Sequence, residues 1–196
     1  PVLFPIIGQL LDGKYRYSGR EYEMPNHGFA RHTVFALKEQ SEDSMSFSLA
    51  SSDETRKCYP FEFELLIKYS VSGHTLRCTS TVINKTDGEM YFSIGAHPGF
   101  NCRIGDAIEF EKGENLRTMR IDSSSILMDE TFPVELQNGR TIRLTEHIFD
   151  KDALILEGLN SESLRLVSGD RTVKFTFGKA PYLGIWAKPN APYVCL

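Results

Sequence analysis

The sequence lacks the short motifs that mark several large enzyme classes. Its 196 residues contain no GxSxG nucleophile elbow, no phosphate-binding P-loop and no dinucleotide-binding glycine fingerprint. No apolar run approaches the roughly 18 residues of a membrane-spanning helix. Lysine and arginine form no basic stripe, and the formal net charge is −4. We therefore expect neither nucleic acid nor a membrane as the partner of this chain.

Cysteine is scarce and shows no metal-binding spacing. The four cysteines, Cys58, Cys78, Cys102 and Cys195, form no CxxC pair and no Cys/His cluster. We expect them to be free thiols of a protein in a reducing compartment, and so a cytoplasmic location. No metal site is expected, because no carboxylate or cysteine accompanies a histidine at ligand spacing.

The sequence shows no signal peptide and no starting methionine, since its first residue is Pro1. A chain of this length with 41% hydrophobic residues can bury one sizeable core. All-β folds of roughly 200–250 residues commonly form one domain. We expect residues 1–196 to be a single β-sandwich domain, and an internal portion of a longer chain.

No segment shows a helical period, and apolar and polar residues instead alternate with a period of two. Residues 61–71 carry the clearest example, with apolar side chains at the odd positions from Phe61 to Val71. Residues 13–23 predict a hairpin turning at Ser18-Gly19, and residues 51–57 predict a hydrophilic loop. The strand at 90–94 is expected to complete a three-stranded meander with 61–71 and 75–83.

Short strands with closely spaced turns continue to the end of the chain. Further strands are expected at residues 34–37, 45–49, 107–111, 120–126, 153–156, 163–168, 172–177 and 183–187. Asn138-Gly139 is the strongest short hairpin signal among the turns. This pattern predicts an all-β fold, a large antiparallel β-sandwich.

Two histidines lie in turns at which a sheet can deliver side chains to a cleft. His97 follows Gly95 and precedes Pro98-Gly99, and Pro98 biases it towards extended backbone. His27 lies in the loop of residues 25–28, four residues before Arg31. Because imidazole has an unperturbed pKa of about 6.5, both rings are candidates for proton transfer near neutral pH.

Acidic and aromatic residues near the ends of strands suit a polyhydroxylated ligand. Asp150 and Asp152 come just before the strand expected at 153–156, and Trp186 is the one tryptophan. Carboxylates accept hydrogen bonds from sugar hydroxyls, and planar aromatic rings pack on sugar faces. We therefore interpret these residues as candidates for binding a small-molecule sugar. His32, His74 and His147 lie among polar residues and are expected at the surface.

Several stretches resemble the aldose 1-epimerases, or galactose mutarotases, and in particular their LacX-type bacterial branch. They follow the family order over nearly the whole chain: LFPIIGQLLDGKY (3–15), PNHGFAR (25–31), PFEFELLIKYSV (60–71), IGAHPGFN (94–101), FDKDALIL (149–156) and LGIWAKP (183–189). The resemblance implies a galactose mutarotase-like supersandwich. It also implies an isomerase that interconverts the α and β anomers of a free aldose by opening and closing the ring.

The resemblance assigns roles to individual residues. It implies that His97 is the general acid and that His27 holds the ring oxygen or a neighbouring hydroxyl. An aspartate before a late strand binds distal hydroxyls, and it corresponds to Asp152 or Asp150, of which we favour Asp152. No metal or organic cofactor is implied.

The chain departs from the family pattern at two places. Gln9 stands where the family typically has a sugar-contacting arginine, although Arg31 offers a guanidinium nearby. The family's general base, a glutamate, corresponds to the position that would follow Leu196. We therefore expect residues 1–196 alone to turn over slowly or not at all.

Three alternatives to a mutarotase stay open from the sequence. One is a non-catalytic carbohydrate-binding module, and another is a hexose-6-phosphate 1-epimerase. A phosphorylated substrate calls for arginines at the cleft, for which the early candidates are Arg20 and Arg31. The third is a β-sandwich without a ligand.

Overall fold

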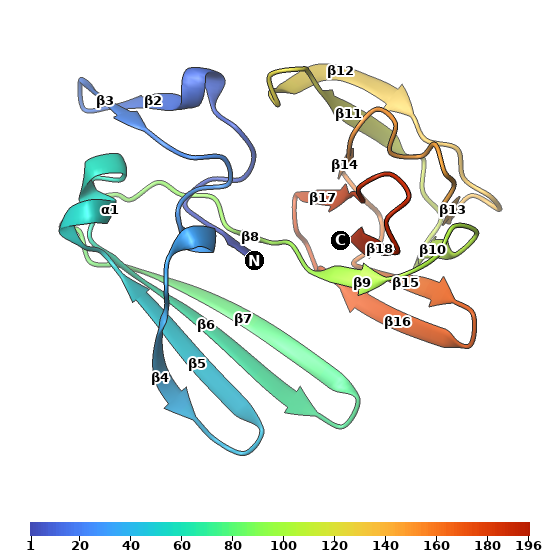
Figure 1. The fold of residues 1–196 in the computed structure, drawn as a ribbon, viewed down its shortest axis with the longest axis horizontal. Coiled ribbons are helices and arrows are strands. Elements are labelled where there is room, and N and C mark those ends of the chain that lie inside the picture. The colour runs from blue at the N-terminus through green and yellow to red at the C-terminus, as the bar shows by residue number, and fades with distance from the viewer. The chain divides into compact units, whose positions relative to one another are not determined.

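The computed structural model describes residues 1–196, and nearly all of its regular secondary structure consists of antiparallel strands (Figure 1). Its contacts divide the chain into two units, Pro1–Ala96 and His97–Leu196. An all-β fold was the prediction, and it is confirmed. That both units form one domain stays a prediction.

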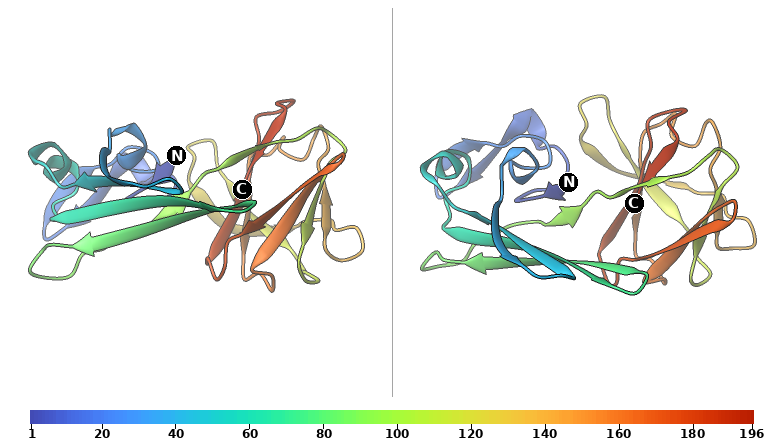
Figure 2. Two further views of the ribbon diagram at one scale, coloured as in Figure 1. Left: turned by 90° about the horizontal axis from the view of Figure 1, so that it is seen from below. Right: turned by 60° about the horizontal axis from the view of Figure 1, so that its bottom comes forward.

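A four-stranded sheet in the order β4-β5-β6-β7 dominates the first unit. Figure 2 shows its strands lying side by side, with the β6–β7 hairpin as the longest part. The strands are β4 (Ala36–Gln40), β5 (Ser44–Ala50), β6 (Phe63–Ser72) and β7 (Thr75–Asn84). The alternation predicted for residues 61–71 is confirmed as far as Ile67, which is buried, whereas Tyr69 and Val71 on the same face are exposed.

Smaller elements complete the first unit. The hairpin predicted at 13–23 is confirmed, because Tyr17 pairs with Arg20 across Ser18-Gly19. The elements are β1 (Val2–Leu3), the 3-10 helix η1 (Leu11–Gly13), β2 (Lys14–Tyr17), β3 (Arg20–Glu23), the 3-10 helix η2 (Ala30–His32) and β8 (Gly95–Ala96).

Phe4 anchors the amino-terminal segment in the core of this unit. Its side chain is fully buried, and its ring centroid lies 5.2 Å from that of Phe63 and 5.8 Å from that of Tyr59. Phe29 approaches it edge-on at 6.1 Å. Because Phe4 and Phe29 pack together, the chain after Phe4 and the loop before Phe29 are brought side by side.

Residues 51–57 were predicted to be a loop, and this prediction is wrong. They contribute to the helix α1 (Asp53–Cys58), which begins with a capping box formed by Ser52 and Thr55. Six residues are too few to display a helical hydrophobic period, so the hydrophilic composition hid the helix. None of the helices has the length and apolar character needed to cross a membrane.

The strand predicted at residues 90–94 is absent, and His97 is not carried by a meander. The chain leaves β7 at Asn84 without further strand pairing until β8, which pairs with β1 instead of β7. Met90 and Ile94 pack against the hydrophobic core as half-buried side chains. Their apolar character reflects this packing, and β-propensity alone does not distinguish it from strand pairing.

The second unit contains two four-stranded antiparallel sheets, ordered β13-β10-β15-β16 and β12-β11-β14-β17, and the pair β18-β9. Its strands are β9 (Gly99–Asn101), β10 (Ala107–Phe110), β11 (Arg117–Ile121), β12 (Leu127–Pro133), β13 (Thr141–Arg143), β14 (Leu154–Glu157), β15 (Ser163–Ser168), β16 (Arg171–Thr176), β17 (Tyr182–Ile185) and β18 (Tyr193–Cys195).

One core joins the two large sheets of the second unit. Ile108 and Leu166 contribute to it from β10 and β15, and Leu156 and Ile185 contribute from β14 and β17. All four side chains are at most 1% exposed. Inward-facing apolar residues from both sheets make the sandwich that the strand pattern predicted.

Two turns in this unit differ in detail from the prediction. The strand expected at 120–126 ends at Ile121, because the Asp122 carboxylate accepts hydrogen bonds from the backbone N–H groups of Ser124 and Ile126. Asn138 and Gly139 do form a tight turn, with φ of 51° and 68°. That turn is flanked by a single antiparallel bridge between Gln137 and Thr141 rather than by the two strands of a hairpin.

Candidate active site

His27 is held rigidly in its loop in the first unit. It is half-buried and has a φ of 62°. Its ring Nδ1 accepts a hydrogen bond of 3.0 Å from the backbone N–H of Gly8. The backbone N–H of His27 donates to the carbonyl oxygen of Gly8 at 2.9 Å. Because Nδ1 is an acceptor, the proton of the neutral ring lies on Nε2. These two hydrogen bonds therefore fix the orientation of the imidazole in the loop.

Gly28 allows this arrangement. It is buried with a φ of 73°, and a Cβ placed on it would lie 2.1 Å from the carbonyl oxygen of Phe4. No other residue fits this close approach of two backbone segments. The segment after Phe4 therefore lies directly against the His27 loop.

Gln9 and Arg31 are the other two residues of the first unit that the sequence predicted for the site. Gln9 is half-buried and directly follows Gly8, so the Gly8–His27 hydrogen bonds bring it into the neighbourhood of the imidazole. Arg31 is exposed in η2. Gln9 and His27 thus lie on neighbouring backbone segments, and their roles in sugar binding stay predictions.

His97 lies between β8 and β9 and contacts Trp186 in the second unit. The two ring centroids are 6.4 Å apart with an interplanar angle of 73°, an edge-to-face arrangement. Cys195 of β18 pairs with Gly99 on one side and forms a bridge with Trp186 on the other. One strand therefore fixes the backbone on both sides of the His97–Trp186 contact.

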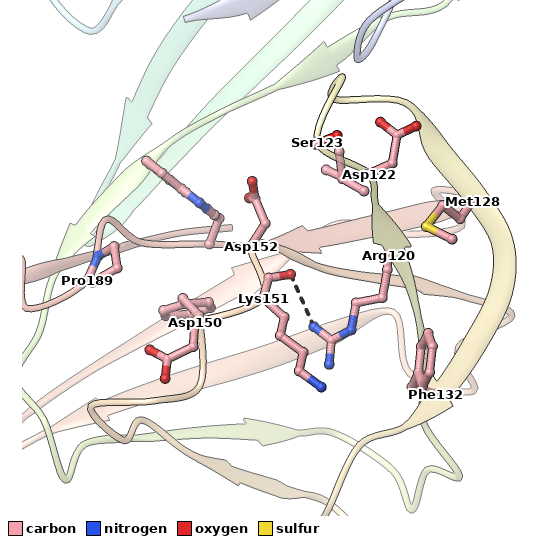
Figure 3. Close-up of a pocket in the computed structure, with 12 residues that line it drawn as sticks. Arg120, Asp122, Ser123, Met128, Phe132, Asp150, Lys151, Asp152 and Pro189 are labelled. Atoms are coloured by element: carbon pink, nitrogen blue, oxygen red, sulfur yellow. Dashed lines mark hydrogen bonds between the residues drawn. The ribbon is translucent and has the colours of Figure 1, made fainter.

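Trp186 also lines a pocket of about 610 Å³ in the second unit, shown in Figure 3. The wall is formed by β11, β12, the turn before β14 and the segment after β17. Its lining residues are Arg120, Ile121, Asp122, Ser123, Met128, Phe132, Phe149, Asp150, Lys151, Asp152, Trp186 and Pro189. Its volume is within the range of roughly 300–1,000 Å³ typical of small-molecule sites.

Asp150 and Asp152 both line this pocket, but their side chains take different directions (Figure 3). Asp150 Oδ2 lies 2.9 Å from His147 Nδ1, so this carboxylate already has a side-chain partner. Asp152 has a φ of 67°, and its Oδ1 accepts only from the adjacent Ala153 N–H, at 2.7 Å. These contacts favour Asp152 as the residue that offers a carboxylate oxygen to a ligand.

Sequence reasoning missed several residues of the pocket. Arg120, Asp122, Phe132 and Lys151 all line it. Lys151 lies between the two predicted aspartates, so the Asp-Lys-Asp run contained a usable signal. The others come from β11, β12 and the turn between them, and no local motif marks them because only the packing of β11 against β14 brings them to the pocket.

The cysteines and the acidic residues offer little alternative chemistry. Burial raises the pKa of the Cys102 and Cys195 thiols, which disfavours the reactive thiolate. All four cysteines are free thiols. No group of three or more histidine, cysteine, aspartate or glutamate side chains is arranged to hold a metal ion.

Comparison with known proteins gives one consistent result. The family model described as aldose 1-epimerase matches residues 1–195. Protein LacX from Lactococcus lactis is 31% identical over 218 residues, which cover 100% of this chain and 71% of that protein. A putative glucose-6-phosphate 1-epimerase from Salmonella typhimurium is 36% identical over 87 residues, 42% of this chain and 27% of the relative.

Among solved structures, the galactose mutarotase related enzyme from Lactobacillus acidophilus is similar to this chain. Its TM-score is 0.91 at 31% sequence identity, and the match covers 100% of this chain and 68% of the other.

Proposed function

The chain belongs to the aldose 1-epimerase family, and from this premise we propose that the protein interconverts the α and β anomers of a hexose. His97 would protonate the ring oxygen while a general base takes the proton of the C1 hydroxyl. The C1–O bond of the ring then breaks and the open-chain aldehyde forms. Rotation about C1–C2 and the reverse proton transfers close the ring on either face.

The observation that carries the proposal is the grouping of His97, Trp186 and Asp152 in one unit. Trp186 contacts the His97 ring and also lines the pocket that contains Asp152. A planar indole can pack on the C–H face of a sugar, and a carboxylate can accept hydrogen bonds from its hydroxyls. The imidazole supplies the proton donor that ring opening requires.

His27 fits a supporting role in the same reaction. Its Nδ1 accepts from the Gly8 N–H, which fixes the orientation of the ring. We propose that this imidazole holds the ring oxygen or a neighbouring hydroxyl without transferring a proton. We propose Gln9 and Arg31 as further polar contacts for the sugar, on the strength of their positions around the same loop.

Anomer exchange by the protein is the direct test. In a polypeptide that includes the position after Leu196, where the family has its general base, freshly dissolved α-glucose and α-galactose should reach anomeric equilibrium faster than in buffer alone, as followed by polarimetry or by NMR exchange between the anomeric protons. Protein inactivated by heat is the control. Sugar binding without any acceleration would instead support the non-catalytic carbohydrate-binding alternative.

The two aspartates are expected to differ in their effect on this reaction. Asp152→Asn should lower kcat/KM by roughly tenfold or more, because a hydrogen bond to a charged group contributes about 1.5–3 kcal/mol. Asp150→Asn should have a smaller effect, since its carboxylate is engaged by His147. Asp170→Asn, in the exposed turn between β15 and β16, is the matched control. A larger loss for Asp150→Asn would reverse our assignment.

A further inference from the structure

Two cations line the pocket without a carboxylate partner. Arg120 and Lys151 both contribute to the wall, and three aspartates line the same pocket. Neither cation takes part in any ion pair of the chain. Two positive side chains close to one pocket repel each other, and an anion placed between them would relieve that repulsion.

The Arg120 guanidinium is already oriented for such a ligand. It lies over the ring of Phe132 at 5.7 Å from the centroid. Its Nη1 donates to the backbone carbonyl of Lys151 at 3.4 Å, the contact drawn in Figure 3. A guanidinium has five N–H donors, so most of them stay available. The aromatic contact and the carbonyl reduce the conformational freedom that ligand binding would otherwise remove.

Two of the three acidic side chains of the pocket, those of Asp122 and Asp150, already have hydrogen-bond partners. Asp122 accepts from two backbone N–H groups of its own turn, and Asp150 is held by His147. In Figure 3 the carboxylates of Asp122 and Asp152 point to one end of the pocket, and the Arg120 guanidinium and the Lys151 ammonium lie at the other. The pocket thus has one end suited to hydroxyl donors and another suited to an anion.

We propose that Arg120 and Lys151 bind an anionic substituent of the sugar, so that the preferred substrate is an aldose with a phosphate or carboxylate on its exocyclic carbon. This inference rests on the proposed function and adds the substrate class to it. Planar guanidinium groups bind both kinds of anion through paired N–H donors, and a lysine adds a point charge. Asp152 would take the hydroxyls at the opposite end.

Binding of locked sugars tests the inference apart from catalysis. Methyl glucoside, methyl glucoside 6-phosphate and methyl glucuronoside have a blocked anomeric oxygen and cannot undergo ring opening. By calorimetry, we expect the charged glycosides to bind roughly tenfold more tightly than the neutral one, or better. The preference should weaken towards about 1 M salt, where the Debye length is near 3 Å.

Substitution of the two cations should remove this preference. In Arg120→Gln and in Lys151→Gln, the ratio of charged to neutral affinity is expected to fall by roughly tenfold. Arg117→Gln is the matched control, because Arg117 lies on the same strand, bonds Thr131 and does not line the pocket. That variant should keep the wild-type ratio.

The outcomes separate the two anions and the two proposals. Tighter binding of the phosphate identifies a sugar phosphate, and tighter binding of the glucuronoside identifies a uronic acid. Equal binding of neutral and charged glycosides, or a preference that survives both substitutions, would overturn the inference. Selective binding in a protein that fails to accelerate anomer exchange of free glucose, glucose 6-phosphate and glucuronate would refute the proposed reaction while supporting the anion site.

Discussion

Replacing His97 by glutamine is expected to lower kcat for anomer exchange by about 10²–10⁴-fold, the usual contribution of a general acid. Glutamine keeps a hydrogen-bonding side chain of similar reach but cannot give up a proton near neutral pH. The loss should therefore fall mainly on kcat, with a smaller change in KM. NMR exchange measured over a range of sugar concentrations separates the two parameters.

The substitution should leave the fold intact, which makes the kinetic result interpretable. Backbone contacts hold this turn, with the Leu196 N–H donating to the Pro98 carbonyl at 3.1 Å and Gly99 pairing with Cys195. His74→Gln, in the exposed turn between β6 and β7, is the matched control and should keep both activity and melting temperature. A His97→Gln protein with a kcat close to that of the wild type would rule out His97 as the acid.

Gly28→Ala is expected to destabilise the first unit by about 2–6 kcal/mol, from a strained backbone together with an overpacked contact. A Cβ at this position would meet the Phe4 carbonyl oxygen at 2.1 Å, and backbone atoms cannot swing aside as a flexible side chain would. The shift would also separate His27 from Gly8, whose N–H fixes the imidazole. Activity should fall together with the denaturant midpoint.

Gly19→Ala offers a control with the same backbone conformation and no steric contact. Gly19 has a φ of 75°, close to the 73° of Gly28, but nothing lies within 4 Å of a Cβ placed there. The Gly19→Ala substitution should lower the free energy of unfolding by only about 1–2 kcal/mol, the usual penalty of an alanine in the left-handed region. Equal losses of stability in the two variants would show that the approach of Phe4 to Gly28 is not the cause.

Much of the fold could be predicted because its signals are local. Period-two alternation in residues 61–71 reflects which face of a strand is buried, and Ser18-Gly19 and Asn138-Gly139 supply the backbone angles that tight turns need. Part of the candidate site could be predicted from the sequence for the same reason. His97, Asp150 and Asp152 lie beside strand ends, where short-range patterns already place side chains outside the ladder.

The partners of these elements were decided only by the tertiary structure. The strand β8 pairs with β1 because of packing between segments some 90 residues apart in the chain. Arg120 and Lys151 share a pocket because β11 pairs with β14, a contact that leaves no local trace in either segment. Periodicity in the sequence reports whether a side chain is buried, while the identity of its neighbours depends on contacts between distant residues.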